Sequence, residues 1–210
     1  MEYLVNMITH VPEGTRDEQV DDVRAREAAH TRELVAQGHV LRLWRPPLVP
    51  GEWRTVGLLA AGDAAELERV LASMPLRVWR SDEITELPAH PNDPGPGAAA
   101  ELRLRDGESP LEFLVTFTPA VPDGTPAEDV AEATHREAES TSELAREGYL
   151  VRLWAPPAGQ GPSPALGLWR ADDEAQMQAI LESLPLYRYA KTQTTPLTPH
   201  PSDPATQASG

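Results

Sequence analysis

The stretch "VLRLWRPP" at residues 40–47 returns, slightly altered, as "LVRLWAPP" at residues 150–157. A shift of 110 residues, from 40 to 150, aligns the two stretches and much of the chain around them without a gap. Between residues 11–47 and 121–157, 18 of 37 positions carry the same residue. A continuous match over so long a period is typical of a duplicated domain rather than of a solenoid. The fold predicted for one copy is therefore predicted for the other.

Each copy carries the pattern of a βαββαβ domain. Alternating apolar and β-branched residues predict the strands, while Thr15 with Glu18 as a capping box, Asp63 as a cap and Gly38 as a stop predict the helices. The first copy has expected strands 2–9, 39–45, 54–61 and 76–87 and helices 15–38 and 63–73. The second copy has expected strands 111–118, 149–154, 165–170 and 186–194 and helices 125–148 and 172–183. This order predicts an α+β fold of two ferredoxin-like domains, whose antiparallel sheets pack as a dimeric α+β-barrel-like pair.

A segment rich in Pro, Gly and charged residues, "GPGAAAELRLRDGESP", separates the copies and reads as a linker. The predicted organisation is a first domain of residues 1–94, a linker of 95–111, a second domain of 112–204 and a tail of 205–210. Domains of this size bury little surface by themselves. We therefore expect the two domains to pack on each other or on further chains, as in a homo-oligomer.

The composition excludes several classes of function. The net charge of −15 and the lack of a Lys/Arg cluster argue against a nucleic acid or an anionic membrane as partner. No apolar run approaches the roughly 20 residues that span a bilayer, and the amino-terminal segment lacks the pattern of a secretion signal, so we expect a cytoplasmic protein. The chain has no cysteine and no HExxH, GxGxxG, P-loop or GxSxG motif. The sequence predicts a small-molecule substrate, no metal and no cofactor.

Glu27 lies on the apolar stripe of the first predicted helix, together with Val20, Val23 and Leu34. Glu137 repeats this placement in the second copy. A carboxyl group on a buried face has a raised pKa and suits a general acid or base near neutrality. The alternative is that Glu27 sits at the edge of the stripe and pairs with a neighbouring arginine, Arg24 or Arg26, in solvent.

The repeated strand carries an arginine and a tryptophan at alternate positions. Strict alternation predicts that Val40, Arg42 and Trp44 share one face and that Leu41 and Leu43 share the other. If two such sheets meet, the arginines could hold a carboxylate or enolate and the indoles could exclude water. The expected substrate-binding residues are Arg42, Trp44, Arg45, Arg152 and Trp154. The alternative is a cation–π or ion-paired structure without a ligand.

Two of the six histidines, His90 and His200, occupy equivalent places in the copies. Each precedes a proline after the last predicted strand. An imidazole can carry a proton near neutral pH, so both histidines are candidate catalytic residues. An equally open alternative is that each anchors its tail through a backbone hydrogen bond.

The helix glutamate, Gly38, the strand "LRLWR", "MPL" at residues 74–76 and the terminal His-Pro together resemble the muconolactone isomerase family. The resemblance covers nearly all of each copy. It implies a ferredoxin-like fold, assembly through paired sheets into larger rings, and cofactor-free isomerisation of a small unsaturated lactone acid by moving a proton between carbons. Glu27 and Glu137 match the family's helix glutamate, and His90 and His200 match its His-Pro.

The chain departs from the family strand, which typically reads Arg-His-Leu-Trp-Arg. Leu41 and Val151 replace its first arginine, and Arg42 and Arg152 stand where its histidine does. The family's final arginine is matched by Arg45 alone, because the second copy has Ala155. The aromatic residue after Pro-Leu is Arg77 in the first copy and Tyr187 in the second. These differences predict a repeated scaffold with asymmetric chemistry.

The leading prediction is a cofactor-independent isomerase or cyclase that acts by general acid/base proton transfer. Its substrate would be a small enolisable lactone or a polyketide-like intermediate of secondary metabolism. Glu27 or Glu137 would move the proton, and Arg42 or Arg152 would stabilise the oxyanion. Two alternatives stay open, which are a cofactor-free oxygenase of the dimeric α+β barrel type and a non-catalytic small-molecule-binding or scaffold protein.

Overall fold

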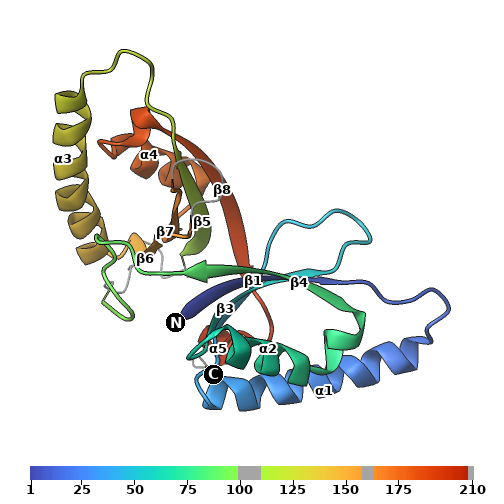
Figure 1. Ribbon diagram of the computed structural model, residues 1–210. Coiled ribbons are helices and arrows are strands. Elements are labelled where there is room, and N and C mark those ends of the chain that lie inside the picture. Colours follow the sequence, from blue (N-terminus) through green and yellow to red (C-terminus); the bar gives the residue numbers. More distant parts are fainter. Residues whose placement is uncertain (99–109, 158–162, 208–210) are drawn as a thin grey trace. The chain divides into compact units, whose positions relative to one another are not determined.

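The computed structural model describes residues 1–98, 110–157 and 163–207 (Figure 1). The chain divides into two compact units. The first unit is Met1–Leu87 with Thr198–Gly210, and the second unit is Pro88–Leu197. Each unit therefore combines the body of one repeat with the carboxy-terminal tail of the other. Most of the predicted linker, residues 99–109, lies outside the described residues.

The first unit is a four-stranded antiparallel sheet with both long helices on one face (Figure 1). Its strands lie in the order β4-β1-β3-β2. Its elements are β1 (Glu2–Thr9), α1 (Asp17–Ala36), β2 (Val40–Arg45), β3 (Arg54–Ala60), α2 (Ala64–Ser73), the 3-10 helix η1 (Pro75–Trp79), β4 (Arg80–Leu87) and the short α5 (Pro204–Gln207). This is the predicted ferredoxin-like arrangement.

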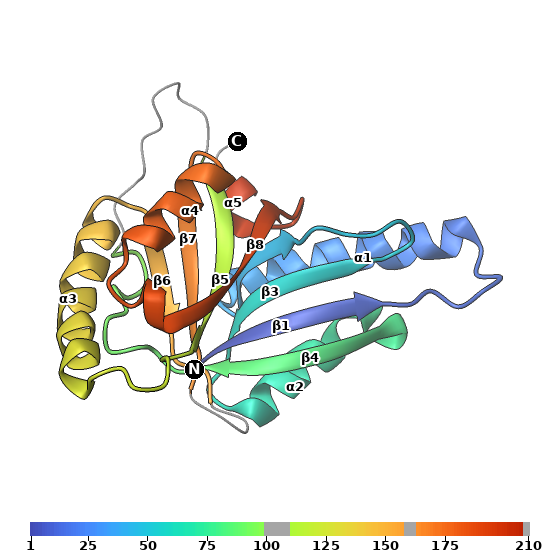
Figure 2. The ribbon, with the colours of Figure 1, turned by 90° about the horizontal axis from the view of Figure 1, so that it is seen from above.

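The second unit repeats the arrangement with strands in the order β8-β5-β7-β6 (Figure 2). Its elements are β5 (Leu111–Pro119), α3 (Ala127–Arg146), β6 (Leu150–Trp154), β7 (Ala165–Ala171), α4 (Glu174–Ser183), the 3-10 helix η2 (Tyr187–Tyr189) and β8 (Ala190–Pro199). Strand β8 crosses the division between the units. Its last residues, Thr198 and Pro199, belong to the first unit, where they pair with Arg45 and Trp44. None of the helices in the described residues is long and apolar enough to cross a membrane.

The helix starts follow the predicted caps in part. Asp63 accepts a hydrogen bond from the Glu66 N–H at 2.7 Å and caps α2 as predicted. Its counterpart in the second unit is Asp173, one residue after the predicted start at 172. The predicted capping box at Thr15 is wrong, because its hydroxyl donates to the Pro12 carbonyl at 2.7 Å and shapes the turn before α1.

The first helix of each unit ends where the sequence predicts, but the fourth strand of each unit begins later than predicted. Gly38 and Gly148 follow α1 and α3 with φ of 79° and 90°, a conformation that other residues adopt at a cost. The fourth strands begin later than predicted, at Arg80 and Ala190. The preceding residues instead form η1 and η2, because a proline and the turn after each helix favour a tight helical segment.

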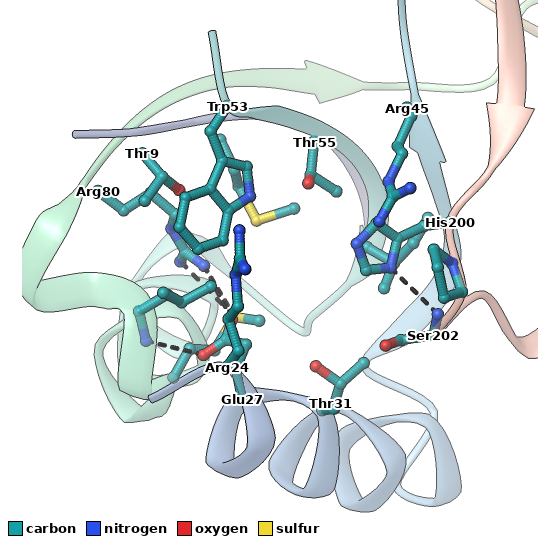
Figure 3. A pocket seen from close by; sticks show the side chains of 16 residues that line it. Thr9, Arg24, Glu27, Thr31, Arg45, Trp53, Thr55, Arg80, His200 and Ser202 are labelled. Carbon is teal, nitrogen blue, oxygen red and sulfur yellow. Dashed lines mark hydrogen bonds and ion pairs between the residues drawn. The ribbon is translucent and has the colours of Figure 1, made fainter. Parts of the chain in front are cut away.

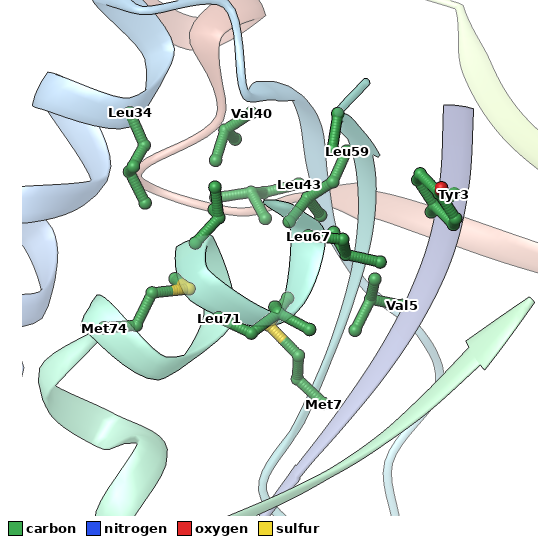
Figure 4. Close-up of a cluster of buried hydrophobic side chains, with 12 residues drawn as sticks. Tyr3, Val5, Met7, Leu34, Val40, Leu43, Leu59, Leu67, Leu71 and Met74 are labelled. Carbon is green, nitrogen blue, oxygen red and sulfur yellow. The ribbon is translucent and has the colours of Figure 1, made fainter. Parts of the chain in front are cut away.

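Alternation along β1 builds the core of the first unit. Every second residue of the strand is buried, and its Tyr3, Val5 and Met7 pack with apolar residues of both helices (Figure 4). Burial of such side chains contributes about 1.5–3 kcal/mol each. The cluster consists of Tyr3, Val5, Met7, Leu34, Val40, Leu43, Leu59, Ala61, Leu67, Val70, Leu71 and Met74.

A β-bulge overturns the predicted faces of β2. Val40 pairs with Leu59 and Arg42 pairs with Leu58, so Leu41 is an extra residue on the β2 side. Val40 and Leu43 therefore share the core cluster, although strict alternation placed them on opposite faces. Strand β6 has the same irregularity between Leu150 and Arg152. The bulge explains how the core keeps both apolar residues while Arg42 and Trp44 remain together.

Candidate functional site

Glu27 occupies the centre of the inward stripe of α1. The stripe includes the buried residues Val23, Thr31 and Leu34. One carboxylate oxygen of Glu27 accepts a hydrogen bond from the Leu76 N–H at 2.8 Å, and the other lies 3.4 Å from Nη1 of Arg80. Its side chain is 12% exposed. The solvent-exposed alternative does not occur, since Arg24 and Arg26 pair with aspartates of α1 instead.

The surroundings of Glu27 raise the pKa of its carboxyl group. Burial is the largest cause, because it disfavours the charged form. The Leu76 N–H and the Arg80 guanidinium oppose this effect by stabilising the carboxylate. The balance of these influences leaves the pKa of Glu27 above the ordinary value of a glutamate carboxyl group. This property suits an acid or base in a proton transfer.

The first pocket, a cavity of about 350 Å³ in the first unit, contains this carboxyl group (Figure 3). Three cations line it, from three different elements: Arg24 of α1, Arg45 of β2 and Arg80 of β4. The Arg24 guanidinium lies 4.4 Å from the ring centre of Trp53, which forms part of the wall. The pocket thus combines one proton-exchanging group with positive charge that suits an anionic ligand.

His200 reaches the first pocket from the carboxy-terminal tail. It lies across the pocket from Glu27 and beside Arg45 (Figure 3). Its backbone N–H donates to the Leu43 carbonyl at 2.9 Å, which attaches the tail to β2. Its ring Nδ1 accepts a hydrogen bond from the Ser202 N–H at 3.1 Å. An accepting Nδ1 places the proton of the neutral ring on Nε2, so His200 serves as a donor.

The neutral form of His200 is also favoured by its electrostatic environment. Burial lowers its pKa, and the neighbouring Arg45 lowers it further, while Asp203 acts in the opposite direction. His200 therefore anchors the tail through its backbone, and its ring borders the pocket. Its role as a catalytic residue stays a prediction.

Arg42 and Trp44 do not line the first pocket, although the strand pattern made them candidate ligand contacts. Instead, Arg42 donates from Nε and Nη2 to Asp203 at 3.1 and 2.9 Å, and Asp203 also accepts from the Leu43 N–H at 3.0 Å. The Arg42 guanidinium lies 4.9 Å from the Trp44 ring centre, and Trp44 is buried. The ion pair and the cation–π contact thus support the tail, as the alternative expected, and ligand binding by Arg42 and Trp44 stays a prediction.

The second unit repeats the frame of the site. Glu137 accepts a hydrogen bond from the Leu186 N–H at 2.9 Å, and burial raises its pKa against the effect of that bond. His90 accepts from the Asn92 N–H through Nδ1 at 3.1 Å, and burial lowers its pKa. Both residues line the second pocket, a cavity of about 450 Å³ in the second unit. The repeat has therefore retained a carboxyl group and an imidazole in each pocket.

The tail of the second unit is held in the same way. Arg152 donates to Asp93 from Nε and Nη2 at 3.2 and 3.1 Å, and the Leu153 N–H donates to Asp93 at 2.7 Å. Arg152 also lies 5.1 Å from the Trp154 ring centre. Neither Arg152 nor Trp154 lines the second pocket. The ion-paired and cation–π arrangement is thus repeated in both units, and ligand binding by Arg152 and Trp154 stays a prediction.

The walls of the two pockets differ strongly. The shift of 110 residues replaces Arg24, Arg45 and Arg80 by Thr134, Ala155 and Ala190, and Trp53 by Ser163. All eight residues line their respective pockets. The change from Arg45 to Ala155, visible in the repeated strand, is one of three such losses. The difference seen at that residue thus extends to three further positions of the pocket wall.

Comparison with known proteins matches the two sequence repeats separately. The family model described as muconolactone delta-isomerase matches residues 1–93 and, separately, residues 111–203. The chain belongs to the muconolactone delta-isomerase family. It is 33% identical to the muconolactone delta-isomerase of Cupriavidus pinatubonensis over 92 residues, which are 44% of this chain and 97% of that protein. It is 29% identical to muconolactone delta-isomerase 1 of Acinetobacter lwoffii over 109 residues, 52% of this chain and all of that protein.

Solved structures with the same fold also match most of the chain. A heme-binding protein from Thermus thermophilus has a TM-score of 0.55 and 14% identity, covering 99% of this chain and 95% of its own. A chlorite dismutase variant from Candidatus Nitrospira defluvii has a TM-score of 0.54 and 14% identity, covering 94% and 91%. At this identity the similarity shows the fold alone. Together with the family match, it confirms the predicted ferredoxin-like fold and the duplication of an isomerase-family domain.

The structure adds residues that pattern reasoning missed. Asp93 and Asp203 follow the equivalent His-Pro pairs at the same distance, so the repeat itself contained a signal for them. Arg24 and Arg80 had no such signal, because the second copy does not keep them. Within the described ranges, no group of three or more His, Asp or Glu side chains could hold a metal ion.

Proposed function

We propose that the first pocket is the active site of a cofactor-independent isomerase that moves a proton on a small, enolisable, anionic lactone. The observation that carries the proposal is the placement of Glu27, with its raised pKa, in a cavity lined by three arginines. Names of the relatives support the lactone, and membership of the isomerase family supports the reaction class. A cyclase acting on a polyketide-like intermediate would use the same proton transfer.

Glu27 would act first as a base and then as an acid. Its carboxylate takes a proton from the saturated carbon next to the double bond of the conjugated lactone, and the electron pair of that C–H bond moves through the double bond into the carbonyl to form a dienolate. The protonated carboxyl group then returns the proton to another carbon of the conjugated system, which moves the double bond. Such proton transfer by a positioned side chain typically contributes ~10²–10⁴-fold in rate.

The other groups of the first pocket would stabilise charge. Arg45 and Arg24 suit the carboxylate of the substrate, since both line the cavity and guanidinium groups bind carboxylates through paired donors. His200, with its proton on Nε2, suits the enolate oxygen as a neutral hydrogen-bond donor. Arg80 lies against Glu27 and would keep a fraction of that carboxyl group ionised.

The second pocket keeps Glu137 and His90 but has no equivalent of these arginines. We therefore assign isomerisation of an anionic lactone to the first pocket. The proposal also includes assembly into a homo-oligomer and a cytoplasmic location. Sedimentation of the purified chain and fractionation of the source cells would examine these two points.

Turnover of muconolactone by the full chain tests the proposal. In deuterated water, exchange of the Glu27 proton with solvent before its return should place deuterium on a substrate carbon as the double bond moves. Glu27→Gln should reduce the rate at least ~100-fold while the protein still binds the substrate, because Gln cannot accept the proton. Glu137→Gln is the matched control and should retain the rate.

Three results would contradict the proposal. Unchanged turnover in Glu27→Gln would show that Glu27 is not the base. Oxygen uptake in step with substrate loss would favour the cofactor-free oxygenase. A chain that binds neither muconolactone nor related lactones saturably would favour the non-catalytic scaffold.

A further inference from the structure

The second pocket has an electrostatic character opposite to that of the first. Among the described residues that line it, none is an arginine or lysine, while the carboxyl group of Glu137 remains. That carboxyl group accepts a hydrogen bond from the Leu186 N–H, a neutral donor. An anionic ligand would meet this acidic group without a compensating cation in the wall. The second pocket therefore disfavours the ligand charge that the first pocket suits.

The walls of the second pocket are richer in aromatic groups. Phe117 replaces Met7 of the first pocket, and Trp169 and Tyr189 add two further rings. The rings of Phe117 and Trp169 form a tilted pair with centres 6.2 Å apart. Offset and tilted contacts of this kind also accommodate an aromatic ligand. At about 450 Å³ the cavity is in the usual range for small-molecule sites.

Polar groups remain at defined places in this apolar cavity. Glu137 projects from α3, and His90 enters from the tail that follows β4. The accepting Nδ1 of His90 leaves a proton on Nε2 of the neutral ring. A carboxyl group and an imidazole can hydrogen-bond a hydroxyl or a carbonyl group. An apolar cavity with a few such groups is the usual form of a site for a neutral ligand.

We propose that the second pocket is a separate binding site for an uncharged aromatic molecule with a hydroxyl or carbonyl group. The aromatic body packs against Phe117 and Tyr189, which line the pocket and are partly exposed, and its polar group bonds to Glu137 or His90. The chain thus holds two sites of different ligand class on one repeated scaffold. This inference does not depend on isomerisation in the first pocket.

Two probes of nearly equal size and shape, one neutral and one anionic, show the effect of ligand charge on binding. 2-Naphthol is uncharged at neutral pH, and 2-naphthoate is an anion. Calorimetric titration of the full chain should show saturable binding of 2-naphthol in the second pocket, and binding of 2-naphthoate there should be at least ~10-fold weaker. Binding is the readout, so failure of the isomerase proposal would not affect the result.

Matched substitutions identify which pocket binds the probe. Thr55 and Ala165 are equivalent positions, and each lines its own pocket. Ala165→Trp fills the second pocket and should abolish 2-naphthol binding, whereas Thr55→Trp fills the first and should leave that binding unchanged. Thr134→Trp, at an exposed position of α3, serves the same purpose if Ala165→Trp does not fold.

A charge-restoring variant tests the electrostatic part. Ala155→Arg introduces into the second pocket the cation that Arg45 provides at the equivalent position of the first pocket. It should strengthen binding of 2-naphthoate at least ~10-fold and change that of 2-naphthol by less than ~2-fold, because only the anion gains an ion pair. The proposal is overturned by equal affinity for both probes in the second pocket, by loss of 2-naphthol binding in Thr55→Trp alone, or by no saturable 2-naphthol binding.

Discussion

Asp203 accepts two hydrogen bonds from the Arg42 guanidinium, although the two residues are 161 positions apart in the chain. The carboxylate is fully buried, and the Arg42 side chain is 16% exposed. This ion pair attaches the tail of the second repeat to a strand of the first repeat, within the first unit. It also fixes the segment that carries His200 into the first pocket. The repeated strand thus contributes to the site by holding another segment in place.

Asp203→Ala should lower the free energy of unfolding by about 3–5 kcal/mol, because it breaks a largely buried ion pair. Release of the tail should also return His200 to solvent. Since burial is the main cause that lowers the pKa of His200, that pKa should rise toward the value of an ordinary histidine. Urea unfolding measures the first effect, and NMR titration of the imidazole measures the second.

Asp93→Ala is the matched control, because Asp93 pairs with Arg152 in the second unit. It should raise the pKa of His90 and leave that of His200 unchanged. Equal changes at both histidines in either variant would show that the tails do not act separately. An unchanged His200 pKa in Asp203→Ala would contradict the anchoring role.

Arg80→Met should raise the pKa of Glu27 further. The Arg80 guanidinium lowers that pKa, and Asp82, which Arg80 also contacts, raises it. Removing the cation therefore removes a stabilising charge and leaves the repulsive one. Carboxyl-carbon NMR should show Glu27 titrating at higher pH, and the acid limb of any Glu27-dependent turnover should move in the same direction. Arg80→Lys keeps the positive charge, so the pKa of Glu27 in this variant should lie between those in Arg80→Met and the wild type. An unchanged pKa of Glu27 in Arg80→Met would show that Arg80 does not influence this carboxyl group.

The domain fold could be predicted because both copies repeat the same local signals. Asp63, the alternation of β1 and the helix stripe around Glu27 each act within one turn or one strand, where sequence determines conformation directly. The faces of β2 could not be predicted, because one extra residue at Leu41 breaks the period of two. Local sequence patterns thus predicted the helices, the strands and the inward face that carries Glu27. They did not predict the orientation of every side chain around that residue.

The exchange of tails could not be predicted for a different physical reason. Arg42 and Arg152 are equivalent, and so are Asp93 and Asp203. Each aspartate could therefore make the same contacts with either arginine, and the sequence contains nothing that separates the two pairings. Only the course of the chain after β4 and β8 decides between them. Arg80 was missed because a buried cation at the start of a strand has no periodic signal.

Glu137→Gln should stabilise the protein in a pH-dependent manner. The pKa of the folded-state carboxyl is raised above its ordinary value of 4.5, so the folded state binds more protons than the unfolded state between the two values. In wild type, this stability is fully present below the unfolded pKa and is lost as the pH rises through the folded pKa. Gln cannot ionise and should not show this loss.

Urea unfolding of wild type and Glu137→Gln at a series of pH values, beginning below the ordinary pKa of a glutamate, measures the difference. The variant should gain stability relative to wild type as the pH rises, and the gap should close at the acid end. A gap that is constant with pH would mean that the two side chains differ only in packing. Glu139→Gln, at an exposed position of α3, controls for the change in net charge.

Gly167→Ala should destabilise the second unit by about 1–3 kcal/mol, the usual cost of overpacking. A Cβ atom at position 167 would overlap with the indole nitrogen of Trp169, a rigid side chain that is fully buried. The equivalent Gly57→Ala meets the end of the Leu59 side chain at 2.7 Å, and that flexible group can move aside. Displacement of Trp169 should also change its fluorescence and weaken any ligand binding in the second pocket. Urea unfolding of both variants measures the two losses of stability. An equal loss in Gly167→Ala and Gly57→Ala would contradict the prediction that the position of the Trp169 indole requires a glycine at position 167.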